Sequence, residues 1–183
     1  MGFLKWYDGM LVARPYLTQA ISTGILFGSG DVIAQQAVER RGLPSHDAIR
    51  TLRLTLYGTA VAGPACAYWY RFLARFIKFE NKAAAMTARV AMDQGLFAPS
   101  FIGVFFTAMS TMEGKSLAET WQKLKETYPS ALVNNYKLWP AVQCINFYLI
   151  PVNYQLLFVN TVALGWNSYL SYASAQPRKV HVE

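Results

Sequence analysis

The chain has 183 residues, of which 54% are hydrophobic, 15% are aromatic and only 15% are charged, and its net charge is +7. Average soluble domains carry about 25% charged residues, so the composition disfavours a soluble domain and favours a membrane protein with an aromatic belt at each interface. No nucleic-acid-binding motif accompanies the basic residues, so we expect no direct nucleic-acid binding and assign the positive charge to membrane topology and to anionic lipids such as cardiolipin.

Three weakly charged segments in the first part of the chain predict membrane-spanning helices. They cover about residues 16–38, 54–70 and 91–112. A helix needs about 20 apolar residues to cross a bilayer, and each segment comes close to that length. Pro15 precedes the first of them and suits the first turn of a helix.

The next segment has the pattern of an amphipathic helix. Ser116 and Glu119 have the spacing of a capping box at a helix start. Apolar residues then recur on one helical face, at Leu117, Trp121, Leu124 and Tyr128. We expect a short amphipathic helix over residues 116–128 that ends at Pro129 and lies either on the membrane surface or against the bundle.

The last tract carries no charged residue and no histidine from residue 138 to residue 177. It is too long for one straight crossing, and Pro151 divides it. We therefore predict a fourth span over residues 132–152 and an apolar helix over residues 153–172. The predicted fold is all-α, a single polytopic membrane bundle over residues 1–183 with about four transmembrane helices, an even number of crossings and both termini on one side.

Small and polar residues share one face of the first predicted span. Gly24, Gly28, Asp31 and Gln35 follow one another at intervals of four, three and four residues. Glycines at such spacing let a neighbouring helix approach closely, so we expect Gly24 and Gly28 to be packing residues, with Gly63 in the same role on the second span. The two polar side chains then face either a polar passage or a hydrogen bond between helices.

A second acidic residue, Asp93, lies at the start of the third span. Arg89 precedes it by one helical turn, so a local ion pair is the simpler expectation and a proton site is the alternative. Gln94 and Pro99 follow, so the helix entry is irregular and Gln94 can satisfy freed backbone groups. Both Asp93 and Gln94 are candidates for a polar interior.

Amide side chains follow one face of the fourth predicted span. Residues at helical spacing on this face are Asn135, Trp139, Gln143, Asn146, Ile150 and Asn153. On a continuous helix they fall within about 80° of one another, although a kink at Pro151 would displace Asn153. Because an unpartnered amide in hydrocarbon is costly, the stripe either lines a water-filled path or locks helices together. Our hypothesis is that Gln143, Asn146 and Asp31 line one passage, in which Asp31 favours cations.

Catalytic and metal-binding signals are missing from the sequence. It contains no GxSxG motif and no P-loop, and its two histidines, His46 and His181, are isolated. Cys66 and Cys144 lie in apolar tracts and are expected to pack as small apolar residues, with a disulfide left open. We therefore expect no enzyme activity, no cofactor and no metal.

Several of these segments together resemble the Mpv-seventeen family of small membrane proteins. The resemblance covers nearly the whole chain. It is carried by residues 134–143, 146–147, 150–151 and 166–171, and upstream by residues 28–31, 35–36, 63–64, 69–70, 93–94 and 98–99. Its motif residues are Trp139, Pro140, Asn146, Phe147, Pro151 and Trp166. One departure is Gln155, which stands where the family usually has an arginine.

The resemblance implies a four-span helical protein of the mitochondrial inner membrane, with the peroxisomal membrane as the alternative location. It implies a channel or transport protein that supports metabolite and ion balance, membrane potential and mitochondrial DNA maintenance under stress. The transported solute and a homo-oligomeric state are left open. The alternative function is a non-conducting protein that organises a membrane complex.

Overall fold

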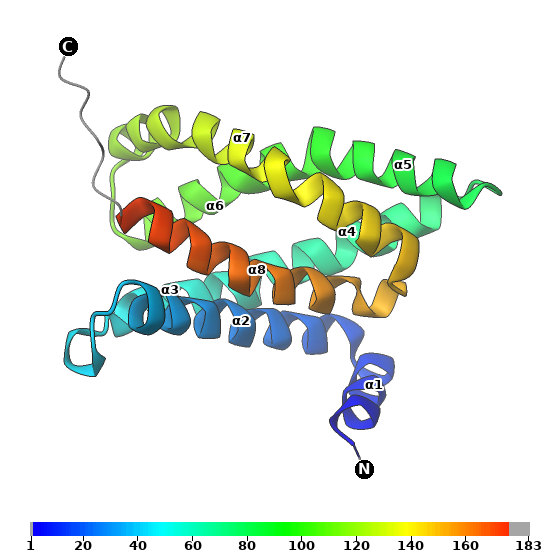
Figure 1. The fold of residues 1–183 in the computed structure, drawn as a ribbon, viewed down its shortest axis with the longest axis horizontal. Coiled ribbons are helices and arrows are strands. Elements are labelled where there is room, and N and C mark those ends of the chain that lie inside the picture. The colour runs from blue at the N-terminus through cyan, green and yellow to red at the C-terminus, as the bar shows by residue number, and fades with distance from the viewer. Residues whose placement is uncertain (1, 176–183) are drawn as a thin grey trace.

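The computed structural model describes residues 2–175, with the backbone alone described for residues 3–4 and 167–175. Every regular element in this range is helical, which confirms the predicted all-α fold. Figure 1 shows long helices running side by side along one axis, with the short helix α1 (Phe3–Ala13) set at an angle to them at one end. The part of the final motif beyond Trp166 therefore lies outside the described side chains.

Three of the long helices join an α-helix to a π-helical turn without a break, and in two of them a second α-helix follows that turn. The first is α2 (Pro15–Ile33) with the π-helical turn η1 (Ala34–Val38), and the 3₁₀ turn η2 (Leu43–Ser45) follows it in the loop. The second is α3 (Ala48–Tyr57), η3 (Gly58–Ala62) and α4 (Gly63–Phe76), and the third is α5 (Lys82–Met92), η4 (Asp93–Phe97) and α6 (Ala98–Met112), where η3 and η4 are π-helical turns. The last two long helices are α7 (Leu117–Leu149) and α8 (Val152–Ala175).

Two of the π-helical turns end two residues before a proline. Pro64 follows η3 and Pro99 follows η4, each near the start of the next α-helix. A proline has no N–H to donate and its ring clashes with the carbonyl four residues earlier. A π-turn displaces that carbonyl by one residue, because its hydrogen bonds join residues five apart. The two helices therefore continue past their prolines.

Helix α7 is longer than the sequence predicts. The expected end of the amphipathic helix at Pro129 is wrong, because α7 runs for 33 residues with Pro129 and Pro140 inside it. The predicted capping box of Ser116 and Glu119 is present at its start. An interior proline costs about 3 kcal/mol, and packing offsets it here: the Tyr128 hydroxyl, next to Pro129, donates to the Pro99 carbonyl oxygen at 3.1 Å and ties α7 to α6.

The chain turns sharply at Pro151, as the sequence predicts. Helix α7 ends at Leu149 and α8 begins at Val152. Helix α8 then runs parallel to α2, since Asn153 near its start accepts a hydrogen bond from Gln19 and Asn160 further along donates to Thr23. Its later part reaches η1 at the other end of α2. The described helices thus pass along the bundle five times, and α1 and the end of α8 lie at opposite ends (Figure 1).

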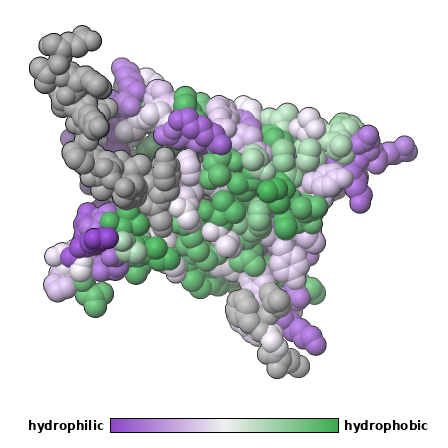
Figure 2. Space-filling view, viewed as in Figure 1, coloured by the Kyte–Doolittle hydropathy of each residue, from purple (hydrophilic) through white to green (hydrophobic). Residues whose placement is uncertain are grey.

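The face of the molecule drawn in Figure 2 is apolar in the middle and polar at its corners. Figure 2 shows hydrophobic residues over the centre of the visible face and hydrophilic residues at its projecting corners. Among the described residues, one helix, Lys82–Met112 with 31 residues, has the length and composition needed to cross a membrane. The exposed apolar side chains come from several helices and include Ile25, Leu56, Val104 and Tyr148.

Apolar side chains pack in two clusters within the bundle. One surrounds Leu73 on α4, Phe147 on α7 and Leu156 on α8. The other surrounds Tyr57, whose ring lies 5.3 Å from the ring of Phe105 in an edge-on arrangement. Polar side chains fill the rest of the interior and form the candidate site.

Candidate functional site

Buried polar side chains come from α2 and η1, from η4, and from α7 and α8. The amides and acids that are at most 8% exposed are Gln19, Asp31, Gln35, Asp93, Gln94, Gln143, Asn146, Gln155 and Asn160. Burying such groups is unfavourable unless they are hydrogen-bonded, so their partners define what the interior does. They form two main clusters.

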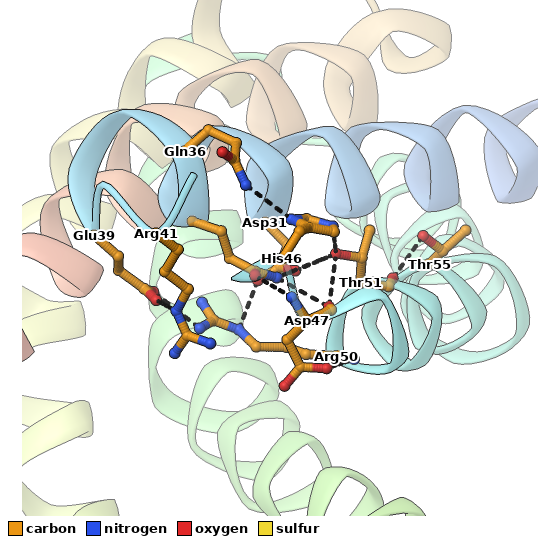
Figure 3. A network of polar contacts seen from close by, with 10 residues as sticks. Asp31, Gln36, Glu39, Arg41, His46, Asp47, Arg50, Thr51 and Thr55 are labelled. Atoms are coloured by element: carbon orange, nitrogen blue, oxygen red, sulfur yellow. Dashed lines mark hydrogen bonds and ion pairs between the residues drawn. The ribbon is translucent and has the colours of Figure 1, made fainter. Parts of the chain in front are cut away.

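The first cluster lies where α2 meets the start of α3, and we call it the Asp31 cluster (Figure 3). One oxygen of Asp31 pairs with the Arg50 guanidinium at 2.7 Å. Its other oxygen accepts hydrogen bonds from the Thr51 hydroxyl at 2.6 Å and from the Gln35 amide at 2.8 Å. Arg50 also bonds Glu39 at 2.9 Å, so its charge is shared between two carboxylates.

Gln35 fixes the turn between these two helices. Its amide nitrogen donates to the Asp47 carbonyl oxygen and its amide oxygen accepts from the Asp47 backbone N–H at 2.7 Å. Nearby, the two ring nitrogens of His46 lie 3.1 Å from Gln36 and from Thr51. The Asp31 cluster therefore holds η1, η2 and α3 together, and its central acid is paired with a cation.

The second cluster, which we call the Asp93 cluster, lies deeper in the bundle. Asp93 is 2% exposed and receives three hydrogen bonds. The Trp69 indole N–H donates to one oxygen at 2.8 Å. The side-chain amides of Gln94 and Gln143 donate to the other at 2.7 and 3.0 Å. These donors come from α4, η4 and α7, so the carboxylate joins three passes of the chain.

No cation bonds Asp93 within the described part of the chain. The expected ion pair with Arg89 is wrong, because the Arg89 guanidinium donates to the Ile77 carbonyl oxygen at 2.9 Å instead. The reason is geometric: Asp93 faces α4 and α7 inside the bundle, whereas Arg89 reaches back to the loop that precedes α5. A buried carboxylate is thus held by neutral donors alone, an arrangement that is expensive in a low-dielectric interior.

The Asp93 cluster continues along α7 toward α8. Gln143 also lies 3.1 Å from the Tyr70 hydroxyl, and its amide oxygen accepts from Asn146 at 2.8 Å. Two amide oxygens in this region, those of Asn146 and Gln155, are buried without a hydrogen-bond partner among the described residues. The Gln155 amide nitrogen lies 3.2 Å from the Ile150 carbonyl oxygen, so the residue at the family's arginine position caps the end of α7.

The amide stripe predicted on α7 is only partly one surface. Asn135 donates to the Gln94 amide oxygen at 3.1 Å, which adds it to the Asp93 cluster beside Gln143 and Asn146. Asn153 lies beyond the turn at Pro151 and is exposed on α8, and its carbonyl oxygen accepts the bond from Gln19. The kink anticipated from Pro151 accounts for that displacement.

The structure does not bring Asp31 to the amides of α7. The hydrogen bonds of Asp31 go to α3 and η1, whereas those of Gln143 and Asn146 go to Asp93, to Tyr70 and to each other. The hypothesis of one passage lined by all three residues is therefore replaced by two separate clusters. In the deeper one, Asp93 takes the place that the sequence hypothesis gave to Asp31.

The motif residues hold the framework around the Asp93 cluster. Phe147 is buried against Tyr70, with ring centroids 5.7 Å apart, and Trp139 packs partly buried on the same apolar cluster. Pro140 lies inside α7 and Pro151 separates α7 from α8. Trp166 is half-buried on α8.

The glycines on α2 and α4 lie at close helix contacts. A Cβ atom added at Gly24 would collide with Thr59, and one at Gly28 would collide with Thr55. At Gly63 it would lie 2.6 Å from the Ala20 Cα and 3.2 Å from the Gln19 carbonyl oxygen. Backbone contacts this close leave room for hydrogen only.

Several partners in these clusters could not be found from the sequence. Trp69 precedes Asp93 by 24 residues and Arg50 follows Asp31 by 19, so no helical spacing connects either pair. Arg71, on α4, donates to the Gln19 amide oxygen at 2.9 Å and stacks on the Tyr16 ring. The pairing of distant helices determines all of these contacts.

The two cysteines and the metal-binding residue types add no further site among the described residues. Cys66 is buried and Cys144 half-buried, and both are free thiols. No group of three or more histidine, cysteine, aspartate or glutamate side chains in the described residues is arranged to hold a metal ion. The Asp93 cluster therefore remains the candidate site.

The sequence of this chain is similar to those of known proteins over nearly its whole length. Residues 110–171 match the Mpv17 / PMP22 family. Protein SYM1 of Gibberella zeae is 52% identical over 175 residues, which cover 95% of this chain and 98% of that protein. Mitochondrial inner membrane protein Mpv17 of Homo sapiens is 45% identical over 172 residues, which cover 94% of this chain and 97% of that protein. No solved structure gives a significant match.

Proposed function

This chain belongs to the Mpv17 / PMP22 family and is a mitochondrial inner-membrane protein, and from this premise we propose that it is a channel or transport protein for small solutes with a preference for cations. In this role it supports metabolite and ion balance, membrane potential and mitochondrial DNA maintenance under stress. One observation carries the proposal: Asp93 is a buried carboxylate bonded by neutral donors, in the helix that is apolar enough to cross a membrane.

An acid inside a membrane protein is costly and marks a functional position by default. Asp93 begins the π-helical turn η4, and such turns are frequent at functional sites. Among the described residues no cation bonds Asp93, so its negative field attracts positive charge. The buried amide oxygens of Asn146 and Gln155 supply further acceptors along α7 and α8.

A specific test of conduction is the variant Asp93→Asn. Asparagine keeps the size of the side chain, and the amides of Gln94 and Gln143 can rotate to accept from it, so we expect the fold to be kept. The purified protein in planar bilayers under a salt gradient should lose cation preference severalfold, with the reversal potential moving toward zero. Asp8→Asn, on α1 outside the cluster, removes the same charge and should leave the reversal potential unchanged.

The result that contradicts this role is an Asp93→Asn protein that conducts with the wild-type reversal potential. A wild-type protein that is folded but passes no ions would favour the alternative function, a non-conducting organiser of a membrane complex. The observation behind that alternative is the number of helices that the two clusters tie together.

We also propose a membrane arrangement for the five passes of the chain. The sequence favours four spans with both termini on one side, but α8 runs parallel to α2 and has 24 residues, enough to cross. We expect the bundle axis to lie along the membrane normal, with the apolar middle of Figure 2 in the bilayer.

This arrangement predicts that the two termini face opposite sides of the membrane. Protease protection of a short tag placed at one end or the other, in mitoplasts and in solubilised controls, measures it. One tag should be cleaved and the other protected. Equal protection of both tags would instead support the even number of crossings that the sequence suggested.

A further inference from the structure

A groove on the outside of the bundle separates parts of α6 and α7. Its volume is about 700 Å³, within the range of small-molecule sites. On the α6 side it is lined by Gly103, Val104 and Ala108, and on the α7 side by Trp121, Leu124 and Lys125. The walls are therefore mostly apolar, with one positive charge.

Two side-chain contacts join α6 and the turn after it to α7 near this groove. At the inner end the Tyr128 hydroxyl bonds the Pro99 carbonyl oxygen. At the outer end Glu113 ties the turn before α7 to the first part of that helix through Lys123 at 3.3 Å. Between these points α6 presents Gly103, where an added Cβ would meet only the Tyr128 ring at 3.9 Å. The missing side chain leaves the space unfilled.

Lys125 is the uncompensated cation of the groove. Its ammonium lies 5.3 Å from the centre of the Trp121 ring. Glu113 bonds Lys115 at 2.6 Å as well as Lys123, and the Lys115 ammonium holds the pKa of this carboxyl below its usual value. Within the described residues no carboxylate pairs with Lys125, so an anion can bind there without displacing an ion pair.

The groove opens on the outside of the bundle, which faces lipid in the membrane arrangement proposed above. Helix α6 is the second half of the apolar helix Lys82–Met112, and Val104 is 48% exposed on it. Trp121 is 60% exposed near the polar end of the bundle, a depth at which tryptophan is enriched in membrane proteins. An apolar slot with a cation at its interfacial end matches a lipid molecule in shape and charge.

We propose that this groove binds one phospholipid of the membrane, with an acyl chain along Gly103 and Val104 and an anionic headgroup on Lys125. The acyl chain replaces poorly packed space on α6, and the phosphate receives the charge-assisted hydrogen bonds of the ammonium. Binding of this kind clamps α6 to α7 and does not depend on whether the protein conducts.

Native mass spectrometry of the delipidated full-length protein, titrated with phosphatidylglycerol or phosphatidylcholine, tests the proposal. We expect one tight site that prefers phosphatidylglycerol by about fivefold, which corresponds to ~1 kcal/mol for one lysine at an anionic headgroup. Lys125→Gln should abolish the preference and keep the weaker binding. Lys137→Gln is the matched control on the same helix, since Lys137 bonds Asn134 and does not line the groove.

Blocking the slot is the second arm of the experiment. Gly103→Leu and Val104→Trp fill the groove from positions with space around them, so we expect unchanged melting and a severalfold loss of affinity for both lipids. A photoactivatable acyl chain should label the groove residues in the wild type only. Undiminished binding in both variants, a preference retained by Lys125→Gln, or crosslinks from the groove to a second protein copy would each overturn the proposal.

Discussion

Replacing Gly63 with alanine should destabilise the bundle by about 2–3 kcal/mol, although the change adds a single methyl group. The new Cβ would lie 2.6 Å from the Ala20 Cα and 3.0 Å from the Gly58 carbonyl oxygen. Both neighbours are backbone atoms, so no side chain can rotate away and α2 must separate from α4. Thermal melting in detergent or in nanodiscs measures the loss.

The matched control for this change is Gly165→Ala on α8. Nothing lies within 4 Å of an added Cβ at Gly165, and alanine favours a helix over glycine by up to about 1 kcal/mol. The two substitutions should therefore shift melting in opposite directions. Equal melting of Gly63→Ala and wild type would show that the helices do not depend on this contact.

Gly28→Ala offers a rescue experiment at a softer contact. There the added Cβ collides with the Thr55 hydroxyl oxygen, whereas the next atom, the Thr55 Cβ, is 3.6 Å away. Thr55→Ala removes that oxygen, so the double variant should recover most of the stability that Gly28→Ala loses. No such rescue is available at Gly63, because its neighbours are backbone.

Replacing Arg50 with alanine should cost about 3–5 kcal/mol, the range for breaking one partner of a buried ion pair. The Asp31 side chain is 1% exposed, so without Arg50 its negative charge is left in the protein with only the bonds from Thr51 and Gln35. The loss should appear as lower thermal melting and as faster proteolysis of the turn between η1 and α3.

Two variants separate the buried charge from the loss of an arginine. Arg50→Ala combined with Asp31→Asn should recover much of the stability, because the remaining amide is neutral. Arg41→Ala removes a cation that is 40% exposed and pairs with Glu39, so it should cost about 0.2–1 kcal/mol. If Arg41→Ala and Arg50→Ala are equally mild, the ion pair of Asp31 does not hold this end of the bundle.

The helical segments could be predicted because apolar periodicity and capping residues are local signals. Ser116 with Glu119, and the break at Pro151, are examples that the structure bears out. The course of the helix through Pro129 could not be predicted, because it depends on a contact between Tyr128 and Pro99 that the chain closes only after folding.

The polar interior was predictable in composition but not in pairing. Burial of Asp31, Gln35, Asp93, Gln94, Gln143 and Asn146 follows from the cost of exposing such groups to hydrocarbon. Which acid meets which cation does not follow, because Arg50 and Trp69 reach their acids across separate helices. Local spacing favoured Arg89 as the partner of Asp93, and the fold directs Arg89 to the Ile77 carbonyl oxygen.

The π-helical turns have a consequence for how the faces of these helices are set. A π-turn contains one residue more than an α-turn, so the angular phase of the side chains jumps by about 100° where it is inserted. In the helix that contains η4, the buried residues Ala98 and Met109 follow the turn and lie within about 20° of one another, whereas Asp93 lies in the turn itself. Each half of such a helix therefore presents its own buried face, and the carboxylate of Asp93 lies at the turn where the two halves join.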